Sequence, residues 1–207
     1  MTAGVNGEVS FWYGDIGGIP EFRATLGGDT QCDVAIVGAG YTGLWTAYYL
    51  MKSDPTLRIV ILEKEFAGFG ASGRNGGWLS GEMGWSREHY AEKTGRQSVI
   101  DLQAAMWATV DEVITVCARE GIDADIIKGG SLHVATTASQ AVRVHHHVEE
   151  EARWGVTAPD LVYLDKAETQ ARIEIDDVRC SSFTPHAARI QPAKLVQGLA
   201  RVVEALG

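Results

Sequence analysis

The chain has 207 residues, of which 45% are hydrophobic and 22% are charged, and its formal net charge is −9. This length allows one good core or a domain and a half, and the composition is that of a globular protein. The negative charge argues against partners such as nucleic acid or an anionic membrane surface. No apolar run approaches the roughly 20 residues that a membrane-spanning helix needs, so no membrane partner is expected.

The cysteines and the first residues bear on the cellular compartment. Cys32, Cys117 and Cys180 are odd in number, widely spaced and without a C-x-x-C pair. They therefore do not form a disulfide framework, and a reducing compartment fits them. The N-terminus lacks the basic and apolar segments of a signal peptide. A cytoplasmic location is the expectation.

Residues 1–31 are expected to form an arm ahead of the first domain. An aromatic cluster, Ser10-Phe11-Trp12-Tyr13, is followed by several glycines and Pro20. Glycine-rich segments without periodicity seldom carry chemistry. The prediction is an extended arm whose aromatic side chains pack on the surface of the domain.

A strand, a glycine turn, a helix and a second strand are predicted over residues 34–62. An apolar run at 34–37 leads into the G-x-G-x-x-G sequence of 38–43, and a helical pattern covers 44–52. A second apolar run at 59–62 ends in Glu63. This is the order of a dinucleotide-binding βαβ unit, and the complete context gives the motif a weight that a lone glycine turn lacks.

Each residue of the glycine turn has a physical role in that interpretation. Gly38 allows the tight turn out of the strand, and Gly40, which has no Cβ, lets the backbone approach a pyrophosphate closely. Gly43 lets the helix pack tightly against the strand. The amides of Tyr41 and Thr42 stand at the helix N-terminus, where unpaired N–H groups and the helix dipole favour an anion.

Glu63 stands where a carboxylate can accept hydrogen bonds from a ribose 2′-hydroxyl. An acid at this place also repels a 2′-phosphate, so NADP is disfavoured. The βαβ unit alone does not distinguish FAD from NAD. A glycine-rich structural turn without a ligand is the plainer alternative.

The loop at residues 69–78, FGASGRNGGW, is too rich in glycine for a regular element and is predicted to be an ordered loop. Together with DVAIVGAGYTGLWTAYYL and the ILEKE strand end, it resembles the D-amino-acid-oxidase-like family of FAD-dependent oxidoreductases, and especially the branch of γ-glutamylputrescine oxidase. The resemblance implies FAD as the cofactor and places this loop beside the flavin and the pyrophosphate.

The resemblance also implies that Ser72, Arg74, Asn75 and Gly76 contribute to FAD binding. Some relatives attach the flavin covalently through a histidine in this loop. Asn75 stands at the comparable position here, so no covalent bond is expected at this place. The whole predicted FAD-binding set is Gly38, Gly40, Tyr41, Thr42, Gly43, Glu63, Lys64, Ser72, Arg74, Asn75 and Gly76.

The segment after this loop is predicted to be mixed helix and strand. Apolar residues recur at three- and four-residue steps over 86–120, which predicts two amphipathic helices separated by Gly95, the second ended by Gly121. Short strands are predicted at 126–127 and 132–135. These helices are expected to pack against a sheet.

A helix predicted at 139–154 carries three consecutive histidines, at 145–147, and three consecutive glutamates, at 149–151. Helical spacing puts His146 with Glu150, and His147 with Glu151, on shared faces. A metal site needs three or four converging ligands, and no others are evident. The favoured interpretation is a solvated face with His–Glu pairs, so no metal is predicted.

The last part of the chain contains two helix starts. Asp165 and Glu168 form a capping-box pattern ahead of a helix at 166–172, and a strand is predicted at 180–184. Pro192 suits the first turn of a helix that runs to 206. In the resembling family, a P-A-K-L-V segment begins the helix that returns the chain to the FAD domain. His186 and Arg189, just upstream, either face the substrate side or belong to a surface loop.

The fold class predicted is α/β, a Rossmann-like FAD-binding domain with a partial inserted α+β substrate domain. The predicted divisions are an arm (1–31), the FAD-binding βαβ unit with its loop (32–85), a partial substrate domain (86–185) and the return helix (186–207). Later strands and further segments of the resembling family are not in this sequence, so the chain is expected to be an N-terminal portion.

The function implied by the resemblance is oxidation of a small-molecule amine or amino acid by hydride transfer to FAD, with oxygen as acceptor. No catalytic base is evident in the sequence, and the catalytic residues stay unknown. Two alternatives remain: an NAD-dependent dehydrogenase, and a non-catalytic nucleotide-binding fragment. The 70–78 loop argues against the first, because a nicotinamide enzyme has no evident need of it.

Overall fold

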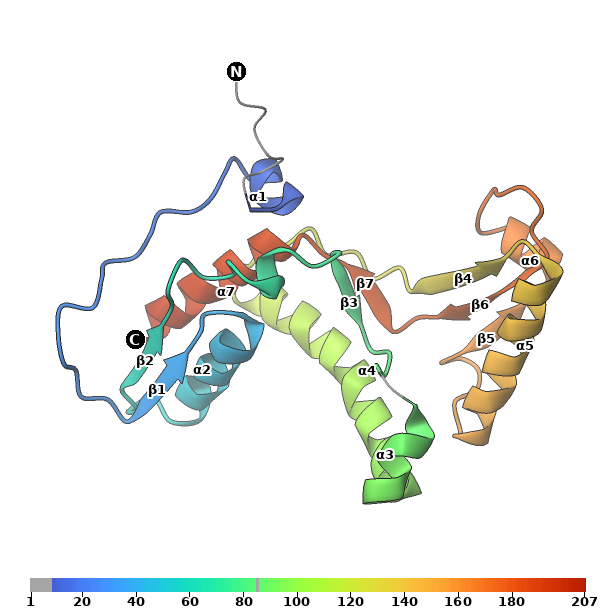
Figure 1. Ribbon diagram of the computed structural model, residues 1–207, viewed down its shortest axis with the longest axis horizontal. Coiled ribbons are helices and arrows are strands. Elements are labelled where there is room, and N and C mark those ends of the chain that lie inside the picture. Colours follow the sequence, from blue (N-terminus) through green and yellow to red (C-terminus); the bar gives the residue numbers. More distant parts are fainter. Residues whose placement is uncertain (1–8, 85) are drawn as a thin grey trace. The chain divides into compact units, whose positions relative to one another are not determined.

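The computed structural model describes residues 9–84 and 86–207 (Figure 1). The chain forms an α/β fold and divides into two compact units, each assembled from separate stretches of sequence. The first unit comprises Met1–Gly77, Ile114–Ile126 and Ile190–Gly207, and the second comprises Trp78–Val113 and Ile127–Arg189. The functional boundaries predicted at 31, 85 and 185 remain a prediction.

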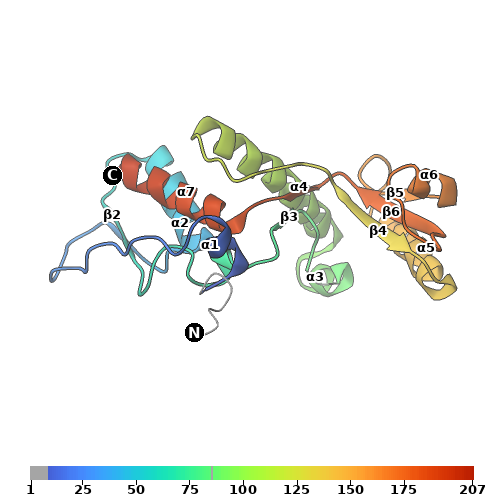
Figure 2. The same ribbon diagram turned by 90° about the horizontal axis from the view of Figure 1, so that it is seen from above.

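The first unit is built on the predicted βαβ arrangement. Strands β1 (Val34–Val37) and β2 (Ile59–Leu62) pair in parallel, from Val34 opposite Ile59 to Val37 opposite Leu62. Helix α2 (Tyr41–Ser53) supplies the crossover that two parallel strands require. Helix α7 (Pro192–Leu206) lies beside α2 in both views (Figures 1 and 2). The strand, turn and helix predictions for this unit are confirmed.

One face of α2 is buried because its apolar residues recur at helical spacing. Leu44, Ala47, Tyr48 and Met51 form this face. The Tyr48 hydroxyl donates a hydrogen bond of 2.6 Å to the carboxylate of Glu120, just beyond the end of α4. This bond ties the helix of the βαβ unit to a stretch of chain about seventy residues away.

The N-terminal aromatic cluster differs from the prediction of an extended arm. Residues 11–15 form a short helix, α1 (Phe11–Asp15), and Tyr13 is fully buried. The ring of Tyr13 meets Phe66 edge to face at 5.2 Å, and Ala193 of α7 completes this small core. Tertiary packing overrides the weak local signal here, because burying the aromatic rings favours a turn of helix.

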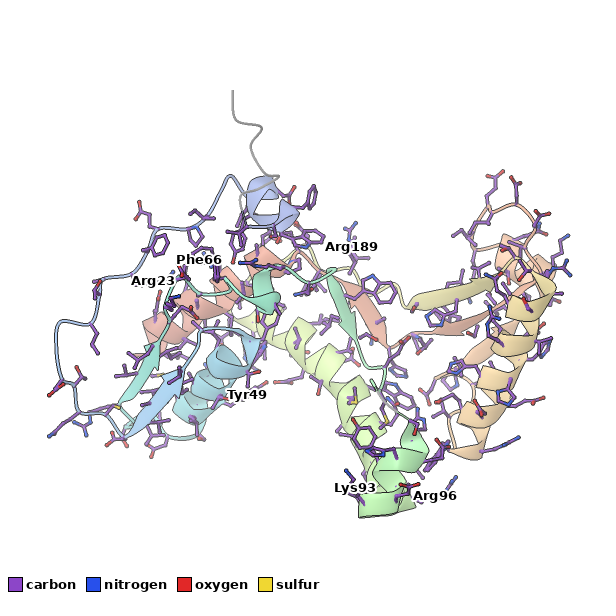
Figure 3. All side chains as sticks on the ribbon, viewed as in Figure 1. Arg23, Tyr49, Phe66, Lys93, Arg96 and Arg189 are labelled. Carbon is purple, nitrogen blue, oxygen red and sulfur yellow. The ribbon has the colours of Figure 1, made fainter. Side chains whose placement is uncertain are left out.

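An irregular segment follows α1 and leads to β1. Arg23 in this segment pairs with Glu204 of α7 at 2.6 Å, and Arg23 and Phe66 both lie near α7 in Figure 3. An exposed ion pair of this kind contributes little to the free energy of unfolding, typically about 0–1 kcal/mol. The ion pair nevertheless shows that this segment passes close to α7.

The second unit contains an antiparallel sheet of three strands in the order β4-β6-β5. They are β4 (Ser131–Ala135), β5 (Val162–Leu164) and β6 (Cys180–Thr184). Helix α5 (Ala138–Arg153) packs along this sheet, and the short α6 (Lys166–Gln170) contacts β5 and β6 (Figure 1). The capping box of Asp165 and Glu168 at the start of α6 is confirmed.

Two helices and a second strand pair belong mainly to this unit. Gly95, at φ +83°, separates α3 (Arg87–Thr94) from α4 (Arg96–Arg119), as the sequence predicts. Strands β3 (Trp78–Ser80) and β7 (Ala187–Arg189) pair in antiparallel fashion and were not predicted. The strand predicted at 126–127 is wrong, because Ile127 makes only an isolated bridge to Arg189.

The acidic and histidine-rich face of α5 is partly as predicted. His146 Nδ1 lies 3.2 Å from a carboxylate oxygen of Glu150. The predicted pair of His147 and Glu151 does not form, because the Glu151 carboxylate accepts hydrogen bonds from Arg87 instead. Within the described residues, no three His, Cys, Asp or Glu side chains gather around a common metal position, and no helix is long and apolar enough to cross a bilayer.

Candidate functional site

The glycine turn connects the end of β1 to the start of α2. Gly38 has φ +100°, a conformation that side-chain-bearing residues rarely adopt, and its N–H donates to the carbonyl of Leu62 at 2.8 Å. A Cβ on Gly43 would lie 2.2 Å from the Gly38 carbonyl oxygen, so helix and strand pack backbone against backbone. The roles that the sequence predicts for Gly38 and Gly43 fit this geometry.

Helix α2 begins at Tyr41, and its N-cap residue, Gly40, has no side chain to cap the first-turn amides. The Tyr41 N–H donates instead to the Ser72 hydroxyl at 2.9 Å. A Cβ on Gly40 would lie 3.0 Å from this same oxygen. The helix N-terminus therefore opens onto Ser72, with its dipole and its amides directed to a place that suits an anion.

Glu63 has a structural role that the sequence does not show. One carboxylate oxygen accepts the Ala39 N–H at 2.8 Å, and the other accepts the Glu65 N–H at 3.1 Å. The acid at the end of β2 thereby holds the glycine turn in place. Each oxygen keeps a second lone pair. Glu63 is exposed, so these lone pairs are accessible to a ribose hydroxyl.

The glycine-rich loop is ordered by its own polar side chains. It contains one turn of 3-10 helix, η1 (Ala71–Gly73). The Asn75 side chain donates to the Ser72 carbonyl at 3.0 Å and accepts the Gly77 N–H at 2.9 Å. Arg74 donates to the Phe69 carbonyl at 2.6 Å, and its guanidinium lies 4.4 Å above the Phe69 ring. The Asn75 amide is thus engaged within the loop, while Arg74 is exposed.

Helix α1 fixes this loop from outside, a role that the sequence analysis missed. The Ser10 hydroxyl donates to the Gly73 carbonyl at 2.8 Å, and the Trp12 indole N–H donates to the Asn75 carbonyl at 2.7 Å. A Cβ on Gly73 would lie only 2.5 Å from the Tyr13 hydroxyl oxygen, so only glycine fits beside this tyrosine. The signal in the sequence was the aromatic cluster, whose partners lie some sixty residues away.

Two further residues of the predicted set differ in their surroundings. Tyr41 donates to the Pro192 carbonyl at 3.1 Å, and burial raises the pKa of its hydroxyl above the ordinary value. Lys64 has a side chain that is 91% exposed, with only a long contact of 3.8 Å to Glu65. Tyr41 therefore supports the turn, whereas Lys64 stands free to approach a ligand from solvent.

A large groove adjoins the turn. Its volume is about 880 Å³, and Ala39, Leu62 and Glu63 are among the residues that line it. Small-molecule sites commonly have about 300–1,000 Å³. The groove runs mainly along β2, α7 and the segment 22–26, and it meets the turn at Ala39 and Glu63. The described residues around the turn therefore offer a helix N-terminus whose N-cap residue has no side chain, an exposed acid and open space beside that acid.

His186 and Arg189, the other polar residues singled out in the sequence, belong to the second unit. The His186 side chain is only 17% exposed; its Nε2 donates to the Asp160 carboxylate at 2.8 Å, and its ring stacks on Trp107 at 4.3 Å. Arg189 is exposed on β7 and projects from the strand in Figure 3. His186 is thus a packed side chain, not part of an exposed loop.

Comparison with known proteins shows the family to which this chain belongs. A family model described as FAD dependent oxidoreductase matches residues 33–207. The chain belongs to this family of FAD-dependent oxidoreductases. The cofactor of the family is FAD, as the sequence analysis predicts.

Curated relatives share about one third of their residues with this chain over the aligned stretch. The chain is 30% identical over 183 residues to the γ-glutamylputrescine oxidoreductase of Escherichia coli, covering 88% of this chain and 42% of the relative. It is 33% identical over 176 residues to a probable oxidoreductase, OrdL, of Rhizobium meliloti, covering 84% and 40%. The chain therefore spans less than half the length of these curated relatives.

Solved structures with the same fold are similar to this chain. The glycine oxidase of Geobacillus kaustophilus is 26% identical and superimposes with a TM-score of 0.63, covering 85% of this chain and 45% of that one. An L-amino acid deaminase from Proteus myxofaciens, at 15% identity, has a TM-score of 0.68 over 91% of this chain. At this low identity, the similarity to the deaminase shows a shared fold and nothing about function.

Proposed function

We propose that this chain is the nucleotide-binding portion of an FAD-dependent enzyme that oxidises a carbon–nitrogen bond in an amine or amino acid. The observation that carries the proposal is the N-terminus of α2, where the N-cap residue Gly40 has no side chain, Ser72 accepts the Tyr41 N–H and Glu63 fixes the turn. Relatives named for oxidation of γ-glutamylputrescine and of glycine support the substrate class.

The bound flavin supplies the redox chemistry, by accepting a hydride from the substrate carbon that bears the nitrogen, with oxygen as the proposed final acceptor. The residues of this chain would bind and orient it. The amides at the start of α2 would bind the pyrophosphate, and Glu63 would accept hydrogen bonds from the ribose. Ser72, Arg74, Asn75 and Gly76 form the loop that runs beside the cofactor, held by α1.

Replacing Glu63 with alanine is expected to weaken FAD binding by about 1–3 kcal/mol, the scale of charge-assisted hydrogen bonds. The change removes the acceptor for the ribose and also the partner of the Ala39 N–H. Quenching of FAD fluorescence during titration measures the dissociation constant. Glu21→Ala, an exposed acid of the same unit, is the control and should bind FAD as the parent does. Equal affinity in both variants would mean that Glu63 does not reach the cofactor.

The proposal is tested by a visible absorption spectrum of the purified 207-residue chain, before and after FAD is added and the excess removed. Retained flavin absorption supports the assignment, and amines and amino acids are then screened for bleaching of the flavin band. NAD is titrated in parallel as the competing dinucleotide. Binding of NAD in preference to FAD, or retention of neither, would overturn the proposed role of this chain.

A further inference from the structure

The sequence contains two asparagines, and both precede a glycine, as Asn6-Gly7 and Asn75-Gly76. Asn6 lies outside the described residues, whereas Asn75 belongs to the glycine-rich loop of the first unit. In an Asn-Gly pair, the backbone nitrogen of the glycine can attack the side-chain amide carbon of the asparagine, because glycine has no Cβ to hinder the approach. Two features of the loop bear on this reaction: the attacking nitrogen and the amide that it attacks.

The backbone nitrogen of Gly76 is accessible as a nucleophile. Gly76 is exposed, and a Cβ built on it would meet no atom within 4 Å. The neighbouring N–H groups are both engaged, since that of Asn75 donates to the Ala71 carbonyl at 3.0 Å and that of Gly77 donates to the Asn75 side chain at 2.9 Å. The Gly76 N–H donates to no described residue, so it is open to solvent base.

The side-chain amide of Asn75 is held over the backbone that follows it. Its Oδ1 accepts the Gly77 N–H, which closes the turn that asparagine makes with the backbone two residues further on. Attack on Cγ converts Oδ1 into an oxyanion, and an N–H already directed at that oxygen stabilises the developing charge. The leaving nitrogen, Nδ2, donates to the Ser72 carbonyl at 3.0 Å, which fixes the orientation of the amide.

We propose that Asn75 is a deamidation site and that the folded loop promotes its reaction. The Gly76 N–H loses its proton to solvent base, its nitrogen forms a bond to Cγ of Asn75, and the Cγ–Nδ2 bond breaks to release ammonia. Water then opens the resulting succinimide at either carbonyl, which leaves aspartate or isoaspartate at position 75. Water is the only co-reactant, and no atom is oxidised or reduced.

The product disturbs the loop at the place where the asparagine amide holds it. The donor to the Ser72 carbonyl is lost, and a carboxylate oxygen faces that carbonyl in its place. Two acceptors that face one another repel, and Ser72 is also the residue that accepts the Tyr41 N–H at the start of α2. We therefore expect deamidation to weaken FAD binding, a consequence that rests on the proposed function.

The test is peptide mapping by mass spectrometry while the 207-residue chain is incubated in mildly alkaline buffer, with and without urea at a concentration that unfolds it. In the folded chain, Asn75 is expected to react about three- to tenfold faster than in urea, the scale of one hydrogen bond to the oxyanion. In urea, Asn75 and Asn6 should react at similar rates, because both are then Asn-Gly pairs in an unfolded chain.

Gly76→Ala should slow the reaction of Asn75 at least about tenfold, because the added methyl group shields the attacking nitrogen. Gly70→Ala is the matched control, since it adds the same group to the same loop away from Asn75, and it should react as the parent does. Neither added Cβ meets an atom within 4 Å, and circular dichroism confirms that both variants are folded. An Asn75 that reacts no faster in the folded chain than in urea, or equally fast in Gly76→Ala, would overturn the proposal.

The consequence for the cofactor is measured separately, by titrating FAD into Asn75→Asp. This variant carries the aspartate product and is expected to bind FAD about tenfold more weakly than the parent. Gln31→Glu makes the same change from amide to carboxylate at an exposed position of the first unit and should bind FAD as the parent does. Equal affinity of Asn75→Asp and the parent would overturn the expected effect on binding. The mass measurement needs no cofactor, so failure of the FAD assignment is distinguishable from failure of the deamidation proposal.

Discussion

Gly40→Val is expected to abolish FAD binding while leaving the chain folded. A Cβ at this position would already lie 3.0 Å from the Ser72 hydroxyl, which accepts the Tyr41 N–H. The two further methyl groups of valine extend into the space in front of the helix N-terminus, where the pyrophosphate has to approach the backbone. Flavin absorption of the purified variant, after incubation with excess FAD, should fall below detection.

The control for this change is Gly27→Val, in the irregular segment of the same unit. A Cβ on Gly27 would meet nothing within 4 Å, and the residue does not need a positive φ. This variant should retain as much flavin as the parent. If Gly40→Val also retained it, the glycine turn would not be the pyrophosphate site, and the proposed binding set would have to be abandoned.

Gly43→Ala is expected to lower the free energy of unfolding strongly, although it adds only one methyl group. The new Cβ would stand 2.2 Å from the Gly38 carbonyl oxygen and 3.1 Å from the Ile36 side chain. Since the first of these is a backbone atom, α2 has to move away from β1. Overpacking of this kind costs about 1–3 kcal/mol in the free energy of unfolding, despite the better helix propensity of alanine.

Urea denaturation followed by circular dichroism measures this loss. Thr46→Ala serves as the matched control, since Thr46 lies on the exposed side of the same helix and bonds only to the Thr42 carbonyl. It should change the free energy of unfolding by less than about 0.5 kcal/mol. A Gly43→Ala variant as stable as this control would show that helix and strand are not in backbone contact.

The βαβ unit was predictable because its signals are local. A run of β-branched residues, a glycine turn and a helical apolar pattern follow one another within thirty residues, and each agrees with the next. The bounds of β1 and β2 match the prediction to the residue. Helix α2 begins three residues earlier than its apolar pattern, because Tyr41 and Thr42 already continue the turn as helix.

The parts that sequence reasoning missed depend on distant partners. Strands β3 and β7 have three residues each and are stabilised by pairing across more than one hundred residues of chain, which no local pattern reveals. Within the proposed site, Glu63 was predicted as a ribose ligand, but its hold on the Ala39 amide follows only from the turn geometry.

Helix α1 brings together residues that are far apart in the order of synthesis. The Gln191 side chain donates to the Trp12 carbonyl at 2.9 Å, across a separation of 179 residues. Closing a flexible loop of that length costs about 5 kcal/mol of chain entropy, which later contacts have to offset. The Trp12 indole N–H also donates to the Asn75 carbonyl, so α1 contacts the cofactor loop and the start of α7 at the same time. The order of this loop is therefore coupled to a contact between the two most distant stretches of the first unit.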